Sequence, residues 1–274
     1  MENRAALGAL ERPTIASPPI PSSPSHAIEE SAPPAASQSW HDSPFLAVAF
    51  ALMAFALYIL VGQVLPLVIT LVEHVVREGV SSPERLIQDV ELIMAASMGR
   101  FLCYGAALCA LLVYTCGRFG LLADEPPKLP LRRQLAWVLG LGCCALLGQS
   151  LLSALLSALG LIPAEQAVIT IAARSGGLGF LLGLAIAAPL AEELIFRRLL
   201  FPNIARGAGR LAAYVLTVGL FAIIHMNPTM LMSYVWLGCC FTYAYERTGS
   251  WRCAFAVHAL NNTVAGLAML YGAA

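Results

Sequence analysis

Two acidic and two basic residues lie back to back inside an otherwise apolar stretch, "AAPLAEELIFRRLLFP", at residues 187–202. Glu193 and Arg197 are four residues apart with the acid first, so in a helix they share one face and can pair. Glu192 points about 100° away from Glu193 around the helix. This spacing leaves Glu192 as a carboxylate that could take part in chemistry.

Each of two later apolar segments carries a histidine at helical spacing from another candidate residue. In "FAIIH", Phe221 and His225 are four residues apart, and in "HALNN", His258 is followed by Asn261 and Asn262 at three and four residues. A single histidine inside a membrane is more often a packing residue that holds helices together. Two histidines, a carboxylate and an amide on three segments fit a catalytic site better.

Charged residues in an apolar segment need a physical reason. Each Glu or Arg near the centre of a bilayer costs about 2.5–3.5 kcal/mol on insertion scales, so such residues indicate function by default. Glu193 and Arg197 can offset part of this cost by pairing. Arg198 has no partner in the sequence pattern, and we expect its side chain to extend toward the cytoplasmic surface.

Depth along the helices predicts which of these residues meet. Glu192 lies 15 residues before the glycine-rich turn at 207–209, and His225 lies 16 residues after it. Both are then roughly 22–24 Å from the turn, so they can meet at one level. His258 lies eight residues after Ser250, or about 12 Å, and needs a tilt, a bend or an offset turn to join them.

Composition places these residues in a polytopic membrane protein. The chain has 274 residues, of which 59% are hydrophobic and 12% charged, and its mean hydropathy is +0.76. The formal net charge is zero and no basic run stands out, which argues against a nucleic-acid partner. We predict an all-α transmembrane bundle of about seven spans, or eight if the first splits at Pro66. The predicted spans are 45–75, 91–117, 134–162, 178–206, 210–226, 229–247 and 251–272.

The chain divides into three parts by composition. Residues 1–43 are rich in Pro, Ser and Ala and predict a disordered tail. Residues 44–177 form the N-terminal transmembrane helices, and residues 178–274 carry every candidate catalytic residue.

Loop charges predict the orientation in the membrane. If the tail is cytoplasmic, most loop arginines and lysines fall on its side, so the positive-inside rule places the N-terminus in the cytoplasm. We expect an integral membrane protein, of the plasma membrane if the chain is bacterial. The eight cysteines lie in apolar stretches without metal-binding spacing, which indicates small buried side chains rather than disulfides.

The three motifs together resemble the CAAX protease and bacteriocin-processing family of intramembrane proteases, which includes the type II CAAX prenyl endopeptidases. That family carries EExxxR, FxxxH and HxxxN in this order on successive transmembrane helices. This sequence has "EELIFR", "FAIIH" and "HALNN", and the resemblance covers roughly residues 178–272.

The resemblance implies hydrolysis of a peptide bond inside the membrane. By that resemblance Glu192 and His225 activate a water, and His258 and Asn262 stabilise the oxyanion. The expected partners are the lipid bilayer and a substrate that is a membrane protein or a lipidated, CAAX-like peptide. The supporting residues would be Glu193, Arg197, Phe221 and Asn261.

Metal dependence is open at the level of sequence. Glu192, His225 and His258 would make a catalytic zinc set with an open position for water. No HExxH motif is present, and family proteins are described both as metalloproteases and as metal-independent glutamate proteases. We favour water activated by glutamate, because the amide of Asn262 suits an oxyanion donor better than a zinc ligand.

Two other classes of function also fit buried charges. A member of the family could act without proteolysis, as a membrane scaffold or a bacteriocin immunity protein. A transporter or proton relay also places Glu, His and Arg inside the membrane. Transporters commonly contain two related halves, and the sequence has no convincing internal repeat.

Overall fold

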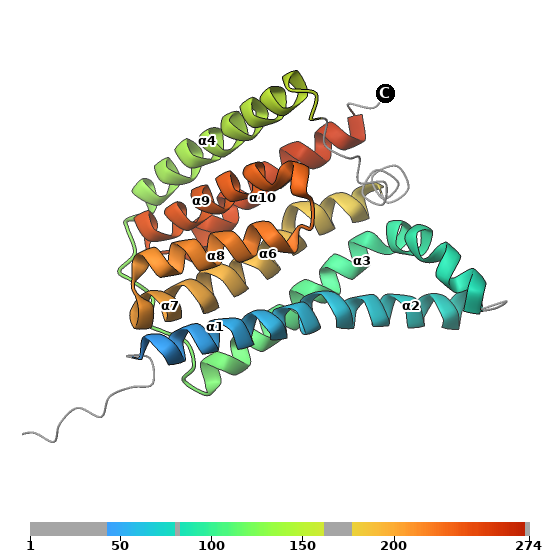
Figure 1. The fold of residues 1–274 in the computed structure, drawn as a ribbon, viewed down its shortest axis with the longest axis horizontal. Coiled ribbons are helices and arrows are strands. Elements are labelled where there is room, and N and C mark those ends of the chain that lie inside the picture. The colour runs from blue at the N-terminus through green and yellow to red at the C-terminus, as the bar shows by residue number, and fades with distance from the viewer. Residues whose placement is uncertain (1–42, 80–82, 162–176, 272–274) are drawn as a thin grey trace, which may run out of the picture. The chain divides into compact units, whose positions relative to one another are not determined.

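The computed structural model describes residues 43–79, 83–161 and 177–271. Within these residues every regular element is a helix, which confirms the predicted all-α class (Figure 1). The predicted tail lies outside the described residues, apart from Ser43, which caps the first helix. The α-helices are α1 (Pro44–Tyr58), α2 (Leu65–Glu78), α3 (Pro83–Arg118), α4 (Leu131–Ala158), α6 (Ala188–Glu193), α7 (Phe201–Ala208), α8 (Arg210–Ile224), α9 (Leu231–Thr248) and α10 (Trp251–Tyr271).

Two of the long helices contain π-helical turns. The first runs from α1 into α2 through the turn Ile59–Val64, so the segment does not split at Pro66. The second, Gly177–Ala208, contains α6 and α7 and is called the central helix below. Its two π-helical turns are Gly183–Ala187 and Leu194–Leu200.

Each π-helical turn ends two residues before a proline: Pro66, Pro189 or Pro202. Proline has no N–H, and its ring collides with the carbonyl four residues earlier in an α-helix. The wider turn relieves this conflict, because the residue before the proline bonds five residues back. These bonds run from Leu65 to Leu60, from Ala188 to Gly183 and from Phe201 to Phe196.

Five helices are long and apolar enough to cross a membrane by length and composition. The structure has a helix at each of the seven predicted segments, but α8 and α9 do not meet this standard. With 15 residues, α8 is roughly 22 Å long, shorter than the ~30 Å hydrocarbon core. The five spans are Pro44–Arg77, Ile93–Arg118, Leu131–Ala158, Gly177–Ala208 and Trp251–Tyr271.

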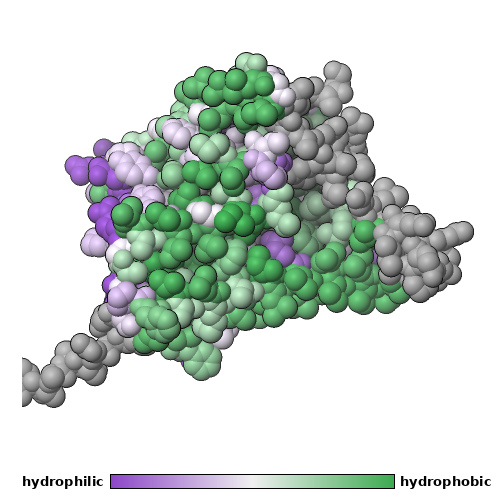
Figure 2. Space-filling model, in the orientation of Figure 1, coloured by the Kyte–Doolittle hydropathy of each residue, from purple (hydrophilic) through white to green (hydrophobic). Residues whose placement is uncertain are grey.

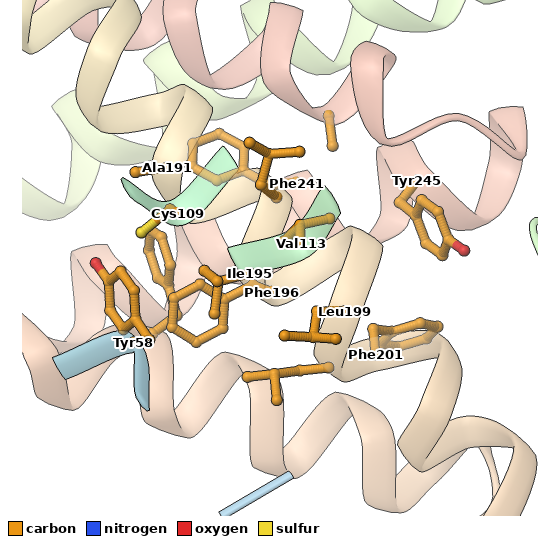
Figure 3. Close-up of a cluster of buried hydrophobic side chains, with 14 of the residues drawn as sticks. Tyr58, Cys109, Val113, Ala191, Ile195, Phe196, Leu199, Phe201, Phe241 and Tyr245 are labelled. Carbon is orange, nitrogen blue, oxygen red and sulfur yellow. The ribbon is translucent and has the colours of Figure 1, made fainter. Parts of the chain in front are cut away.

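The central helix is the most buried of the five spans. Half of its most apolar window is buried, against 17–33% for the other four. Ile195 and Leu199 lie in a cluster with side chains from α1, α3 and α9 (Figure 3). The ring of Phe196 meets Tyr58 and Phe221 edge-on, at 5.8 and 5.6 Å between centroids. Helices from both sides of the predicted boundary at residue 177 therefore build one core.

The outer surface is largely apolar (Figure 2), as expected for helices that face lipid. Hydrophilic side chains gather at the end of the bundle where α7 and the start of α4 lie. All eight cysteines are free thiols, and the predicted burial holds for half of them. The exposed ones are Cys103, Cys143, Cys144 and Cys239.

Candidate active site

Glu193 and Arg197 form the predicted ion pair at the centre of the bundle. Their side chains are fully buried, and Arg197 Nη1 lies 3.0 Å from Glu193 Oε1. Arg197 also donates to the Gly238 carbonyl at 3.0 Å and to Thr242 Oγ1 at 3.3 Å, both on α9. Its guanidinium therefore links two helices and neutralises a buried carboxylate, as a charge inside the membrane requires.

His258 lies between the two glutamates. Its Nδ1 lies 2.9 Å from Glu193 Oε1, and its Nε2 lies 3.9 Å from Glu192 Oε2. Since an ionised carboxylate can only accept, Nδ1 carries a hydrogen, and Glu193 orients the ring. The ring also stacks on Phe241, with 4.2 Å between centroids. His258 is thus held on two sides, with Nε2 directed toward Glu192.

Glu192 is the less constrained of the two carboxylates. Its side chain is 13% exposed, and its Oε2 is buried without a hydrogen-bond partner. The 3.9 Å to His258 exceeds a direct hydrogen bond. Glu192 therefore keeps the acceptor capacity that a general base needs.

His225 ends α8 with its tautomer fixed by the backbone. Its Nδ1 lies 2.7 Å from the Phe221 carbonyl, which can only accept, so Nδ1 carries a hydrogen and, in the neutral ring, Nε2 carries the lone pair. Its ring stacks on Tyr234 at 3.9 Å. The Phe221 ring contacts both His225 and His258, at 4.9 and 5.8 Å. Among the described residues, no hydrogen bond or ion pair joins His225 to Glu192, so their predicted meeting is not a direct contact.

His258, which the depth argument places too low, does reach the glutamates. The contact is made by Glu193, one residue nearer than Glu192 to the glycine-rich turn at 207–209. The π-helical turn Leu194–Leu200 lies between Glu193 and that turn and puts more residues into each helical turn. Glu193 therefore lies closer to the turn than α-helical rise predicts.

The two asparagines of α10 differ in their surroundings. The amide of Asn262 donates through Nδ2 to the Leu184 carbonyl at 3.0 Å, rather than facing Glu192 or His258. Asn261 is 2% exposed, and its Oδ1 is buried without a partner. The amide of Asn262, which the resemblance assigns to the oxyanion, is thus bonded to the backbone of the central helix.

The predicted zinc set does not come together. In the part of the chain that the structure describes, no group of three or more His, Cys, Asp or Glu side chains is placed to hold a metal ion. Glu193 engages His258 Nδ1 and leaves Nε2 near Glu192, but among the described residues no hydrogen bond or ion pair brings His225 to Glu192. The arrangement therefore does not fit a metal bound by Glu192, His225 and His258.

Arg198 has partners that the sequence did not suggest. Its Nη1 donates to the Ala123 carbonyl at 3.0 Å, and its Nε lies 3.2 Å from Glu125 Oε1. Arg198 therefore holds the loop between α3 and α4, and its expected extension toward the cytoplasmic surface stays a prediction. The same loop bonds to the end of α9 through the Leu129 N–H and the Thr248 carbonyl, at 3.0 Å.

One face of α9 supplies site residues that the sequence analysis missed. They stack on the histidines or bond to Arg197, and they lie at the three- and four-residue spacing of a single helix face. This spacing is readable in the sequence, but the partners across the helix interface are not. The residues are Tyr234, Gly238, Phe241 and Thr242.

Comparison with known proteins gives one family. Residues 174–264 match the model described as "Type II CAAX prenyl endopeptidase Rce1-like". The matched region contains all three motifs, and the resemblance to the CAAX protease family is confirmed over these residues. Neither the search of curated proteins nor that of solved structures found a match.

Proposed function

Because residues 174–264 belong to the CAAX protease family, we propose that the chain is an intramembrane endopeptidase. Its substrate would be a membrane-associated protein or a lipidated, CAAX-like peptide. The observation that most supports this proposal is the pair formed by Glu192 and His258. A carboxylate with a free, buried oxygen faces a histidine that a second carboxylate orients.

In the proposed reaction, Glu192 takes a proton from a water molecule as the water oxygen attacks the peptide carbonyl carbon. When its ring is neutral, His225 offers the lone pair of Nε2 as a second acceptor for the proton of this water. The tetrahedral intermediate collapses when the carbon–nitrogen bond breaks, and the leaving nitrogen receives the proton that Glu192 took from water, which restores the carboxylate. General acid–base catalysis of this kind contributes about 10²–10⁴-fold to the rate.

His258 is the proposed donor to the oxyanion. With both ring nitrogens protonated, Nδ1 stays bonded to Glu193 and Nε2 gains a hydrogen to donate. The cluster would then hold two carboxylates, one guanidinium and one imidazolium, so its charges cancel. The resemblance assigns Asn262 to the oxyanion as well, but the proposal does not require it, because its amide is bound to Leu184.

The proposed setting is a membrane with the N-terminus in the cytoplasm, and the plasma membrane in a bacterium. Five spans support an integral membrane protein. The positive charges of the loops support the orientation.

The proposal is tested by cleavage in proteoliposomes, with a prenylated CAAX peptide beside a pool of transmembrane segments. We expect the wild-type protein to cleave at least one of them, and His225→Gln and His258→Gln to lower kcat by roughly 10²-fold or more. Thr217→Ala, a buried polar change on α8 outside the site, is the control for general damage. Cleavage by both histidine variants at the wild-type rate would refute the assigned roles.

A further inference from the structure

The carbonyl of Leu184 lacks both of the partners that a regular α- or π-helix would give it. In an α-helix it would accept from Ala188, but the Ala188 N–H bonds to the Gly183 carbonyl. In a π-helix it would accept from residue 189, which is proline and has no N–H. An unpaired carbonyl inside a membrane-spanning segment is costly. The pairing of the Leu184 carbonyl must therefore come from another element.

Asn262 of α10 supplies the missing donor. Its Nδ2 lies 3.0 Å from the Leu184 oxygen, and the carbonyl can only accept, so the amide nitrogen faces it. α10 and the central helix approach closely here, because Gly266, one turn after Asn262 on α10, has no side chain. A Cβ at Gly266 would lie 2.9 Å from Leu181 Cδ1 and 3.2 Å from Leu184 Cδ2.

This hydrogen bond sets the register of α10 against the central helix. His258 lies four residues before Asn262, on the same face of α10. Glu192 and Glu193 lie eight and nine residues after Leu184 on the central helix. A slip of one residue moves a helix by about 1.5 Å, enough to break the 2.9 Å contact between His258 and Glu193.

We propose that Asn262 is a positioning residue, whose amide replaces the N–H that Pro189 lacks and holds α10 where His258 meets the two glutamates. The expected effect of Asn262 on cleavage rests on the proposed function, whereas its expected effect on stability does not. This positioning role depends on the missing N–H of Pro189, whereas a direct contact between Asn262 and the oxyanion would not.

A double-mutant cycle of Asn262→Ala and Pro189→Ala tests the dependence. Pro189→Ala gives the helix an N–H that can bond to Leu184. We expect Asn262→Ala alone to lower Tm by roughly 3–8 °C and kcat by about 10²-fold with KM nearly unchanged. In the Pro189→Ala background, the same substitution should lower Tm by less than half as much. It should lower kcat by only about tenfold.

Equal losses in both backgrounds would overturn the proposal, because an oxyanion donor contributes regardless of residue 189. Thr263→Ala is the matched control, since its hydroxyl bonds only within α10, to Ala259. If Pro189→Ala does not fold, the single variants decide: an Asn262→Ala protein as stable as Thr263→Ala also overturns the proposal. The Tm comparison needs no cleavage, so failure of the protease assignment would be seen separately.

Discussion

At the scale of single residues, the candidate site contains two carboxylates with different surroundings. Glu193 is fully buried and engaged by both Arg197 and His258, whereas Glu192 keeps one oxygen without a hydrogen bond. Adjacent residues point to different sides of a helix, so the sequence alone separates their environments. We infer that Glu193 supports the site and that Glu192 performs chemistry.

The ion pair between Glu193 and Arg197 predicts a non-additive effect on stability. Arg197→Met should destabilise the protein by about 3–5 kcal/mol, because it leaves a buried carboxylate without its partner. The double variant Arg197→Met/Glu193→Gln should lose less than Arg197→Met alone, since both charges are removed. Thermal unfolding in detergent measures both. A double variant less stable than Arg197→Met would contradict the pairing argument.

Residue spacing predicted which side chains share a face but not which faces meet. The i,i+4 pairs Glu193–Arg197 and Phe221–His225 are local, and both are in contact in the structure. Contacts between helices depend on rise and tilt, which the π-helical turns change. The depth argument assumed a constant α-helical rise, and it therefore left the position of His258 open.

At the scale of elements, prolines and π-helical turns shape the bundle around the site. All three turns precede prolines, and two of them flank the pair of glutamates on the central helix. The prolines are visible in the sequence, but proline alone predicts a break as readily as a continuous helix. The outcome depends on neighbours such as Asn262, which pairs the Leu184 carbonyl.

The loop between α3 and α4 is a second element fixed from the central helix. Arg198→Ala removes the bonds to Ala123 and Glu125, so we expect faster hydrogen exchange across residues 119–130, by about tenfold or more. Exchange measured by mass spectrometry reports this directly.

The control for the loop experiment is Arg100→Ala. Arg100 also pairs with a glutamate, Glu73, but this pair joins α2 and α3. Arg100→Ala should therefore leave hydrogen exchange in the loop between α3 and α4 unchanged. Unaltered exchange in Arg198→Ala would show that other contacts hold the loop.

At the scale of the whole molecule, the sequence predicted the helical class and the position of each helix, because apolar length is a local property. It predicted seven spans, and five of the described helices are long and apolar enough to cross a membrane by length and composition. Both five and seven crossings put the two termini on opposite sides, so the C-terminus does not distinguish them. The turn between α8 and α9 distinguishes five crossings from seven. If α8 does not cross, this turn stays within the membrane, because α8 is shorter than the hydrocarbon core.

We predict that this turn lies within the membrane. The end of α8, with His225, would stop roughly 8 Å short of the far surface, which keeps the histidine in the bilayer. A cysteine at Met226, which is 89% exposed on the protein, should resist a membrane-impermeant thiol reagent added from the non-cytoplasmic side.

A cysteine at Gly79, at the end of α2, is the positive control for the labelling. Signals are compared with the protein that carries only its native cysteines. Labelling of Met226→Cys as fast as Gly79→Cys would instead indicate that α8 and α9 both cross the membrane.

The central claim is that Glu192 activates water for peptide-bond hydrolysis, and the most direct measurement is kcat for Glu192→Gln on a peptide that the wild-type protein cleaves. Because Glu192 Oε2 has no hydrogen-bond partner, we predict a loss of roughly 10²-fold or more with no fall in Tm. Glu246→Gln, at the Arg210 and Tyr214 contact of α9, is the matched control and should keep its activity. Cleavage by Glu192→Gln at the wild-type rate would contradict the account.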